Sequence, residues 1–141
     1  MDNSIYKVRN RVKKYIELIA DIQEIDLKFQ EIEEEILGIS GQGTEERTGK
    51  TYKITSSVEQ QAEKLMERKE ELYIEQAAKK REIKRIDNAL SILTDDERTI
   101  IQLALIERKK YWRLEQKLNL SYSRIKQMEY DAVKKMKSYI S

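Results

Sequence analysis

The sequence predicts an all-α protein, in which a long antiparallel, coiled-coil-like helical hairpin precedes a small C-terminal helix-turn-helix domain. Three observations predict this fold. Hydrophobic residues recur every three or four positions through two long segments, all four glycines lie between these segments, and the last third contains short helical stretches separated by capping residues. We expect the hairpin to span residues 1–93 and the helix-turn-helix domain to span residues 94–141.

The first long helix is predicted from an unbroken apolar stripe. The members of the stripe are Ile5, Val8, Val12, Ile16, Ile19, Ile22, Ile25, Phe29, Ile32 and Ile36. Their spacing places them along one side of an α-helix. A small C-terminal domain cannot bury so long a stripe, so the stripe needs a partner helix.

The segment from Gly38 to Thr55 is predicted to be a long loop, because it holds all four glycines. Within it, Gly43 to Thr51 is similar to a nucleotide-binding P-loop, but five residues separate its glycines where the motif has four, and no buried strand precedes it. We therefore expect a connection without a nucleotide site, which a partner or DNA would order.

The second long helix is predicted to begin at Ser56, where Ser56 to Glu59 has the pattern of a capping box. Its apolar residues are Val58, Ala62, Leu65, Leu72, Ile83, Ile86, Leu90 and Leu93. Lys69, Gln76 and Lys79 interrupt this series, and we expect polar packing there. The simplest arrangement pairs the two helices as an antiparallel hairpin, and self-association into a multi-helix coiled coil is a natural addition.

Charge along the predicted hairpin has a direction. Bases gather at the start of the first helix and the end of the second: Lys7, Arg9, Arg11, Lys13, Lys14, Lys79, Lys80, Arg81, Lys84 and Arg85. Acids gather at the far end: Glu31, Glu33, Glu34, Glu35, Glu59 and Glu63. In the first helix this order opposes the macrodipole, so helix stability does not explain it. Either the basic end extends a DNA-contacting surface, or two hairpins pair head to tail.

Three short helices are predicted after residue 93. Thr94 to Glu97 forms another capping box and starts a helix that runs to about Glu107. A second helix is expected from about Lys110 to Leu118, and a third from about Tyr122 to Tyr139 with Ser121 as its N-cap. The short connection between the last two helices is typical of a helix-turn-helix.

The third of these helices has two distinct faces. Ile125, Met128, Ala132, Val133 and Met136 form an apolar face, which we expect to pack on Leu114, Leu118, Ile101 and Leu105. The opposite face is polar near the N-terminus, the end that enters the major groove in helix-turn-helix proteins. Gln pairs with adenine and Lys with guanine. The predicted base-reading residues are therefore Tyr122, Ser123, Lys126 and Gln127.

Basic residues surround this helix. The segment from Glu107 to Ser141 has ten Lys or Arg against four Asp or Glu, a net charge of +6, whereas the whole chain carries +2. Such a surface attracts DNA phosphates without reading sequence, although a solvated charged face is common in a chain that is 38% charged. The predicted phosphate contacts are Lys109, Lys110, Ser121, Arg124, Lys134 and Lys135.

The segment from Leu93 to Ile140 resembles the fourth, promoter-binding region of bacterial sigma factors. The recognition helix of that family commonly reads S/T-R-E-R-I-R-Q-I-E-x-x-A-L-x-K-L-R. The residues that fit this frame are Ser121, Arg124, Ile125, Lys126, Gln127, Met128, Glu129, Ala132, Val133, Lys135, Met136 and Lys137. Tyr122-Ser123 replaces the family's base-reading Arg-Glu pair. The resemblance thus implies DNA binding at a sequence other than the usual promoter hexamer.

The order of segments resembles the ArpU/RinA-type late transcriptional regulators of phages and prophages. Those proteins have a helical N-terminal part, a polar insertion and a sigma-like C-terminal segment in which a Trp opens the first helix of the motif, as Trp112 does here. Lys53 to Ser57 is loosely similar to a short element of the family. The resemblance implies an activator of phage late genes that binds double-stranded DNA upstream of a promoter and works with the RNA polymerase of the bacterial host.

Two other classes of function stay open. A sigma-like polymerase subunit would contact core polymerase directly, but nothing here resembles the sigma segment that melts promoter DNA. A small terminase-like packaging or architectural protein also joins a helix-turn-helix to an oligomerising helical part, although terminase subunits usually place the motif first. A purely structural coiled coil would leave the C-terminal pattern unexplained.

Composition argues against enzymes and membrane proteins. The chain has no Cys and no His, which removes disulfides, the usual zinc ligands and His-based proton transfer. We expect no enzyme, no metal and no cofactor. No apolar run approaches the roughly 20 residues of a membrane span, and the N-terminus lacks a signal-peptide core. We therefore expect a protein of the bacterial cytoplasm with no membrane partner.

Overall fold

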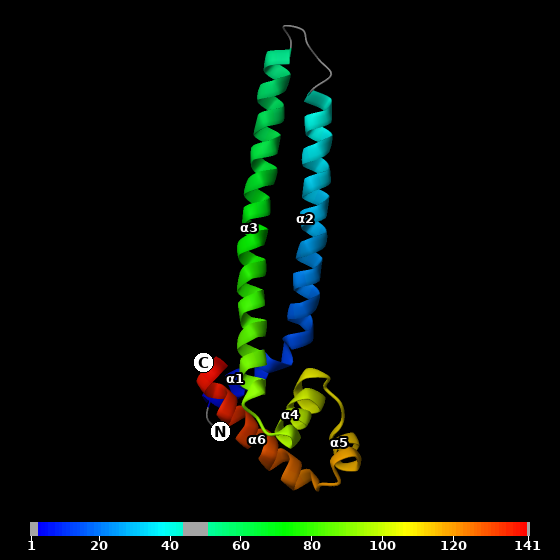
Figure 1. Cartoon of the computed structure of the whole chain (residues 1–141), viewed down its shortest axis with the longest axis vertical. Coiled ribbons are helices and arrows are strands. Elements are labelled where there is room, and N and C mark those ends of the chain that lie inside the picture. The colour runs from blue at the N-terminus through cyan, green and yellow to red at the C-terminus, as the bar shows by residue number, and fades with distance from the viewer. Residues whose placement is uncertain (1–2, 44–50, 141) are drawn as a thin grey trace. The chain divides into compact units, whose positions relative to one another are not determined.

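A computed structural model describes residues 3–43 and 51–140, with the side chains of residues 3–39 and 57–140. Within these ranges the chain is all-α, as predicted, and it has no β-strand (Figure 1). None of the helices described carries an apolar stretch long enough to cross a bilayer. The helices are α1 (Asn3–Lys13), α2 (Tyr15–Gly43), α3 (Thr51–Ser91), α4 (Asp95–Ile101), the π-helical segment η1 (Gln102–Ile106), α5 (Tyr111–Leu118) and α6 (Tyr122–Ile140).

These helices form two compact units. Unit 1 comprises Met1–Ala20 and Lys80–Ser141, and it therefore includes α1, the start of α2, the end of α3 and all the helices that follow. Unit 2 comprises Asp21–Lys79, the remaining lengths of α2 and α3. The predicted domain boundary between residues 93 and 94 does not coincide with this grouping and stays a prediction.

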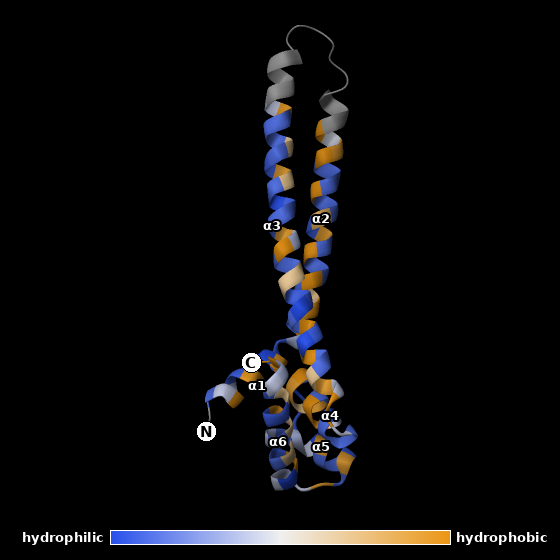
Figure 2. Ribbon diagram, turned by 60° about the vertical axis from the view of Figure 1, so that its left-hand side comes forward, coloured by the Kyte–Doolittle hydropathy of each residue, from blue (hydrophilic) through white to orange (hydrophobic). Residues whose placement is uncertain are grey.

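In unit 2, α2 and α3 pack antiparallel, as the hairpin prediction requires (Figure 1). Ile25, Ile32 and Leu72 are buried between the helices, and Phe29, Ile36 and Leu65 pack against them. Figure 2 shows hydrophobic residues at intervals along both helices, mixed with hydrophilic ones. The pair is thus held by a narrow apolar seam.

The seam becomes polar where the sequence predicted it. Gln76 is buried, and its Nε2 donates to the carbonyl oxygen of Ile22 at 3.0 Å and to Oδ1 of Asp26 at 2.7 Å. Lys69 pairs with Glu33 at 3.2 Å, and Lys79 pairs with Asp21 at 2.9 Å. The interruptions therefore join the two helices through polar contacts.

The first long helix is broken, contrary to the prediction of one continuous helix. α1 ends at Lys13, and Lys14 forms a turn in which its N–H donates to the carbonyl oxygen of Arg11 at 3.2 Å. The Leu18 N–H then donates to the carbonyl oxygen of Lys14 at 2.9 Å, which restores the α-helical pattern.

Burial of the α1 side chains explains the break. Ile5, Val8 and Val12 are buried in unit 1, whereas Ile16 and Ile19, next in the predicted stripe, are exposed. Burying one such aliphatic side chain stabilises the fold by about 1.5–3 kcal/mol, more than one helical hydrogen bond contributes. The partners of α1 in this cluster include Ile86, Ala89, Leu93, Ile101, Leu105, Ile106, Ala132, Val133, Met136 and Ile140.

Both ends of the predicted loop from Gly38 to Thr55 are helical, contrary to the prediction. α2 continues to Gly43, and α3 already begins at Thr51, so Ser56 does not start the helix. A glycine inside a helix costs only about 1 kcal/mol relative to alanine, too little to stop a helix that is already formed. Residues 44–50, most of the segment that is similar to a P-loop, lie outside the described residues.

The C-terminal helices lie close to their predicted positions. α5 and α6 begin within one residue of the predicted starts, and the helix after Thr94 ends at Ile106. Its last five residues form η1, which the sequence did not predict; there the Glu107 N–H donates to the carbonyl oxygen of Gln102, five residues back, at 2.9 Å. After α5, Asn119 adopts a left-handed conformation with φ of 57° and turns the chain towards α6.

The apolar face of α6 packs as predicted. Ile125 is buried with Leu114, and Met128 and Leu118 pack against this cluster. Further along α6, three residues join Ile101 and Leu105 in the cluster that also holds α1: Ala132, Val133 and Met136. α6 therefore contributes to both apolar clusters of unit 1.

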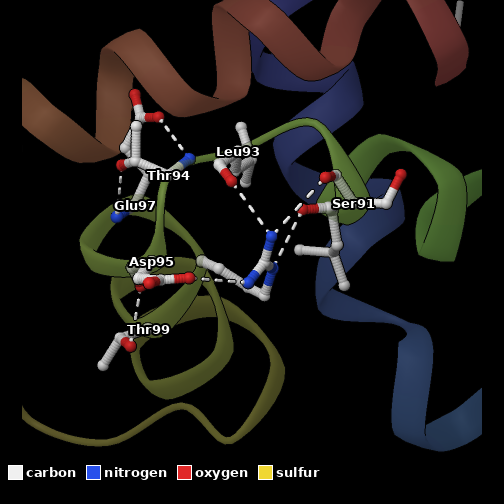
Figure 3. Close-up of polar contacts among 8 residues, drawn as sticks. Ser91, Leu93, Thr94, Asp95, Glu97 and Thr99 are labelled. Atoms are coloured by element: carbon white, nitrogen blue, oxygen red, sulfur yellow. Dashed lines mark hydrogen bonds and ion pairs between the residues drawn. The ribbon is translucent and has the colours of Figure 1, made fainter.

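Polar contacts fix the junction between α3 and α4 (Figure 3). The Thr94 N–H donates to Oε1 of Glu97 at 3.0 Å, and the Glu97 N–H donates to the Thr94 hydroxyl at 3.2 Å, which confirms the predicted capping box. Arg98 donates from Nε to the carbonyl oxygen of Leu90 at 3.1 Å and from Nη2 to that of Leu93 at 3.0 Å. Because carbonyls at a helix end lack helical partners, Arg98 ties α4 to the end of α3.

Glu97 also joins α4 to α6. Nζ of Lys135 lies 2.9 Å from both carboxylate oxygens of Glu97. Burial acts to raise the pKa of the Glu97 carboxyl, but hydrogen bonds from Thr94 and Lys135 outweigh it and hold the pKa below its ordinary value. A carboxylate whose pKa is lower in the folded state stabilises the fold above its unfolded pKa, and this stabilisation is lost as the pH falls.

We predict that Glu97→Gln lowers the free energy of unfolding at pH 7 by about 0.5–1 kcal/mol, because glutamine keeps the capping contact but loses the charge opposite the partly exposed Lys135. Urea unfolding followed by the fluorescence of Trp112, the only Trp in the chain, measures this. The difference from wild type should shrink as the pH falls through the lowered pKa of Glu97, because the protonated carboxyl no longer pairs with Lys135. Asp96→Asn is the exposed control, and a difference for Glu97→Gln that stays constant from pH 7 to pH 3 would contradict the assignment.

Candidate nucleic-acid interface

The two units carry opposite net charges. Unit 1 has 20 Lys or Arg against 11 Asp or Glu, a net charge of +9, and unit 2 has 8 against 15, a net charge of −7. The small net charge of the whole chain hides this separation. A polyanion such as DNA is therefore attracted to unit 1 and repelled by unit 2.

The first turns of α6 hold the residues predicted to read bases. The Arg124 N–H donates to the Ser121 hydroxyl at 3.2 Å, which confirms Ser121 as the N-cap. Tyr122, Ser123 and Gln127 are exposed, and Lys126 is half-buried. The N-terminal part of α6 thus presents polar side chains to solvent while Ile125 is buried beneath it.

Three of the predicted base-reading residues already have contacts within unit 1. The Tyr122 ring packs edge-on against the Tyr111 ring, with the centroids 5.4 Å apart. Nζ of Lys126 lies 3.3 Å from the Tyr111 hydroxyl and 4.8 Å from the centroid of its ring. Nε2 of Gln127 donates to Oδ1 of Asp131 at 3.1 Å on the exposed side of the helix. To pair with a base, each side chain must give up the contact described here. The cost is small for Gln127, because its partner is exposed to water.

Glu129 is a buried carboxylate at the centre of this region, with 3% of its surface exposed. Nε of Arg9 in α1 donates to its Oε1 at 2.9 Å, and the Tyr111 hydroxyl in α5 donates to its Oε2 at 2.5 Å. Burial, together with the hydrogen bond to Glu129, raises the pKa of Tyr111, so this hydroxyl stays protonated and remains a donor. One carboxylate of α6 therefore joins α1 and α5. In the sequence, Glu129 is recognisable only as a member of the sigma-like frame.

All six predicted phosphate contacts are exposed, but only three of them lack a side-chain partner among the described residues. Lys110 precedes α5, and Arg124 and Lys134 lie on α6. Their side chains make no hydrogen bond or ion pair among the residues that the structure describes. A phosphate group can therefore bind them without displacing a partner found in this part of the chain.

The other predicted phosphate contacts have partners. Lys135 is paired with Glu97, as described above, and Nζ of Lys109 lies 4.0 Å from Oε1 of Glu107. The Ser121 hydroxyl caps α6 by accepting a hydrogen bond from the Arg124 N–H. Lys135 in particular stabilises the packing of α4 on α6, which the sequence did not indicate.

Two of the basic residues at the start of the chain form ion pairs within unit 1. Arg11 donates two hydrogen bonds to the carboxylate of Glu82, at 2.7 Å and 2.6 Å, and a third to the carbonyl oxygen of Ile140. Arg9 is paired with Glu129. These two arginines thus hold α1 against α3 and α6, while Lys7 and Lys14 are exposed.

A groove of about 650 Å³ lies between α1 and the first half of α6. Its lining includes all four predicted base-reading residues, Tyr122, Ser123, Lys126 and Gln127, together with Tyr6 of α1. Sequence analysis did not place α1 here, because the break at Lys14 was not foreseen. The groove thus places α1 beside the predicted base-reading face.

Comparison of the chain with protein-family models, curated proteins and solved structures finds no match. We therefore infer the function from the geometry and charge of unit 1 and from the residues of α6.

We predict that Glu129→Gln lowers the free energy of unfolding by about 1–3 kcal/mol, because it removes the charge that pairs with Arg9 and leaves a buried contact incomplete. The cost lies below that of a fully buried pair, since part of Arg9 reaches solvent. Urea unfolding followed by Trp112 fluorescence measures it. Asp131→Asn makes the same chemical change on the same helix and should have little effect. Equal stability of the two variants would show that Glu129 does not hold the helices together.

Proposed function

We propose that the protein is a sequence-specific transcriptional regulator that binds double-stranded DNA through α6. The observation that carries this proposal is the exposed polar face at the start of α6, on a unit of net charge +9. An α-helix fits the major groove, where Gln and Lys distinguish base pairs by their hydrogen-bonding groups. The surrounding bases supply affinity for phosphates of any sequence.

The arrangement of α5 and α6 supports a helix-turn-helix. Three residues separate them, Asn119 turns the chain, and Leu114 and Ile125 pack together in a shared cluster. A short turn and a common core are the features that hold a recognition helix in helix-turn-helix proteins. We propose that α6 is that helix and that α5 lies against the DNA backbone, with Lys109 and Lys110 at its start.

From the sequence resemblances, we propose that the DNA bound by this protein lies near promoters. The frame from Ser121 to Lys137 is similar to the sigma-factor recognition helix, and the order of segments resembles the ArpU/RinA-type regulators. The protein we propose is accordingly an activator of phage late genes that acts with the RNA polymerase of its bacterial host. Tyr122-Ser123, in place of Arg-Glu, gives it an operator of its own.

We further propose that unit 2 serves self-association. Its paired helices leave several large hydrophobic side chains exposed: Leu27, Leu37, Met66, Tyr73 and Ile74. Exposed apolar residues on a two-helix pair favour the addition of further helices. Two copies would bring two α6 helices to half-sites separated by whole turns of DNA.

A nuclease footprint on DNA from the gene's own neighbourhood, with and without RNA polymerase, tests the role in transcription. Protection just upstream of a promoter, strengthened by polymerase, is the expected result. Protection within a packaging sequence would instead support the terminase-like alternative. Absence of protection on all fragments would contradict DNA binding of either kind.

We predict that Gln127→Ala weakens binding to the footprinted site by about 1–3 kcal/mol and leaves binding to unrelated DNA nearly unchanged, because a base-reading side chain contributes only at its cognate base. Lys134→Ala should weaken binding to both duplexes alike, because it removes a phosphate contact. Fluorescence anisotropy with the two duplexes measures both variants. If Gln127→Ala weakens both duplexes equally, Gln127 is not a base-reading residue.

A further inference from the structure

We propose that α1 is a second DNA-contacting element, and that one strand of the duplex lies in the groove between α1 and α6 while α6 occupies the major groove. The proposal rests on the proposed function and adds to it an element outside the helix-turn-helix. It concerns the sugar-phosphate backbone of the strand and not the reading of bases.

α1 is held firmly beside α6. Val8 and Val12 are buried against residues of α6, including Val133 and Met136. Arg9 pairs with the buried Glu129 of α6 at 2.9 Å. Apolar burial and an ion pair to a buried carboxylate together fix the position of α1 before any DNA binds.

The dimensions of DNA and of packed helices are compatible with one DNA strand lying between α1 and α6. The major groove is about 12 Å wide, and an α-helix with its side chains is about 10–12 Å across, so one helix fills the groove. Helices packed against each other lie about 8–10 Å apart. When α6 is in the groove, its neighbour α1 therefore lies over the phosphate strand that borders the groove.

The groove has the chemistry of a nucleic-acid backbone site. Tyr6 of α1 and Tyr122 and Tyr130 of α6 line it, and all three are exposed. Their hydroxyls can donate hydrogen bonds to phosphate oxygens.

The charge of α1 also fits a phosphate strand. Asn3–Lys13 contains four bases and no acid: Lys7, Arg9, Arg11 and Lys13. Arg9 and Arg11 are paired inside unit 1, but Lys7 is exposed. The exposed Lys7, at the rim of the proposed interface, therefore attracts a polyanion.

The opposite role for α1 would be to obstruct α6. Because α1 borders the face that bears Tyr122 and Gln127, it could keep DNA away from these residues. In that case a change that disturbs the groove would raise the affinity for DNA. The two roles therefore predict changes of opposite sign.

The test substitutes Tyr6, which is 53% exposed, with glutamate and measures binding to a fluorescein-labelled DNA duplex of random sequence. A carboxylate in the groove repels the phosphate strand, so Tyr6→Glu should lower the affinity by roughly tenfold or more. Tyr139→Glu is the matched control, since Tyr139 is 46% exposed on α6 of the same unit but does not line the groove. This control changes the charge of unit 1 by the same amount and should alter the affinity by less than about twofold.

Each outcome bears on the proposal. The role of α1 would be overturned if Tyr6→Glu left the affinity for DNA unchanged or raised it. An equal loss of affinity in Tyr6→Glu and Tyr139→Glu would overturn it as well. In either case, binding of DNA by the wild-type protein would still support the proposed function. Wild-type protein that binds no duplex would overturn both proposals.

A second measurement does not depend on the stability of the glutamate variant. A photoreactive benzoyl-phenylalanine at position 6 should crosslink to the duplex, as should the same group at position 122. The same group at position 139, or at the exposed position 73 of unit 2, should not. Crosslinking at position 122 without crosslinking at position 6 would leave α6 as the reader of DNA and exclude α1 from the interface.

Discussion

The hydrogen bonds of Glu129 determine how the proposed DNA-binding surface is built. This carboxylate sits on α6, is almost fully buried, and accepts from Arg9 of α1 and Tyr111 of α5. A buried carboxylate must keep such partners, because losing one leaves its charge unsatisfied. The orientation of α6 relative to α1 and α5 is therefore fixed on its inner side. Tyr122, Ser123 and Gln127 remain exposed on the same helix.

The ion pair between Arg9 and Glu129 also affects how much positive charge unit 1 has available for DNA. Arg9 and Arg11 hold α1 in unit 1 by pairing with Glu129 and Glu82, so part of the positive charge is used for packing. The remaining bases still give this unit a net charge of +9 against −7 in unit 2. This division supports unit 1 as the partner of DNA and leaves unit 2 for contacts with protein.

The C-terminal helices could be predicted from the sequence because their signals are local. The capping box at Thr94 and the N-cap at Ser121 each act over three residues, and both are present in the structure. The apolar face of α6 could be read from its spacing for the same reason.

The sequence-based predictions failed where contacts between residues far apart in the chain determine the structure. The break at Lys14 follows from the burial of Ile5, Val8 and Val12 against α6, which no local pattern reveals. Helix α2 continues through Gly38 and Gly41 to Gly43, because each glycine costs a formed helix only about 1 kcal/mol. The groove beside Tyr122 needs α1 in its actual place, so it could not be predicted without the structure. The exposure of Tyr122, Ser123 and Gln127 could be predicted from the sequence, but the contacts of Lys126 with Tyr111 and of Gln127 with Asp131 could not.

An amide chemical-shift titration of the whole protein with a DNA duplex tests the central claim most directly. It observes both units at once and needs no knowledge of the operator, because the proposed nonspecific binding would also bring α6 close to DNA. The account predicts that the largest shift changes fall on the first half of α6, from Tyr122 to Gln127, and that residues of unit 2 change little. Changes confined to unit 2, or no changes at low salt, would contradict it.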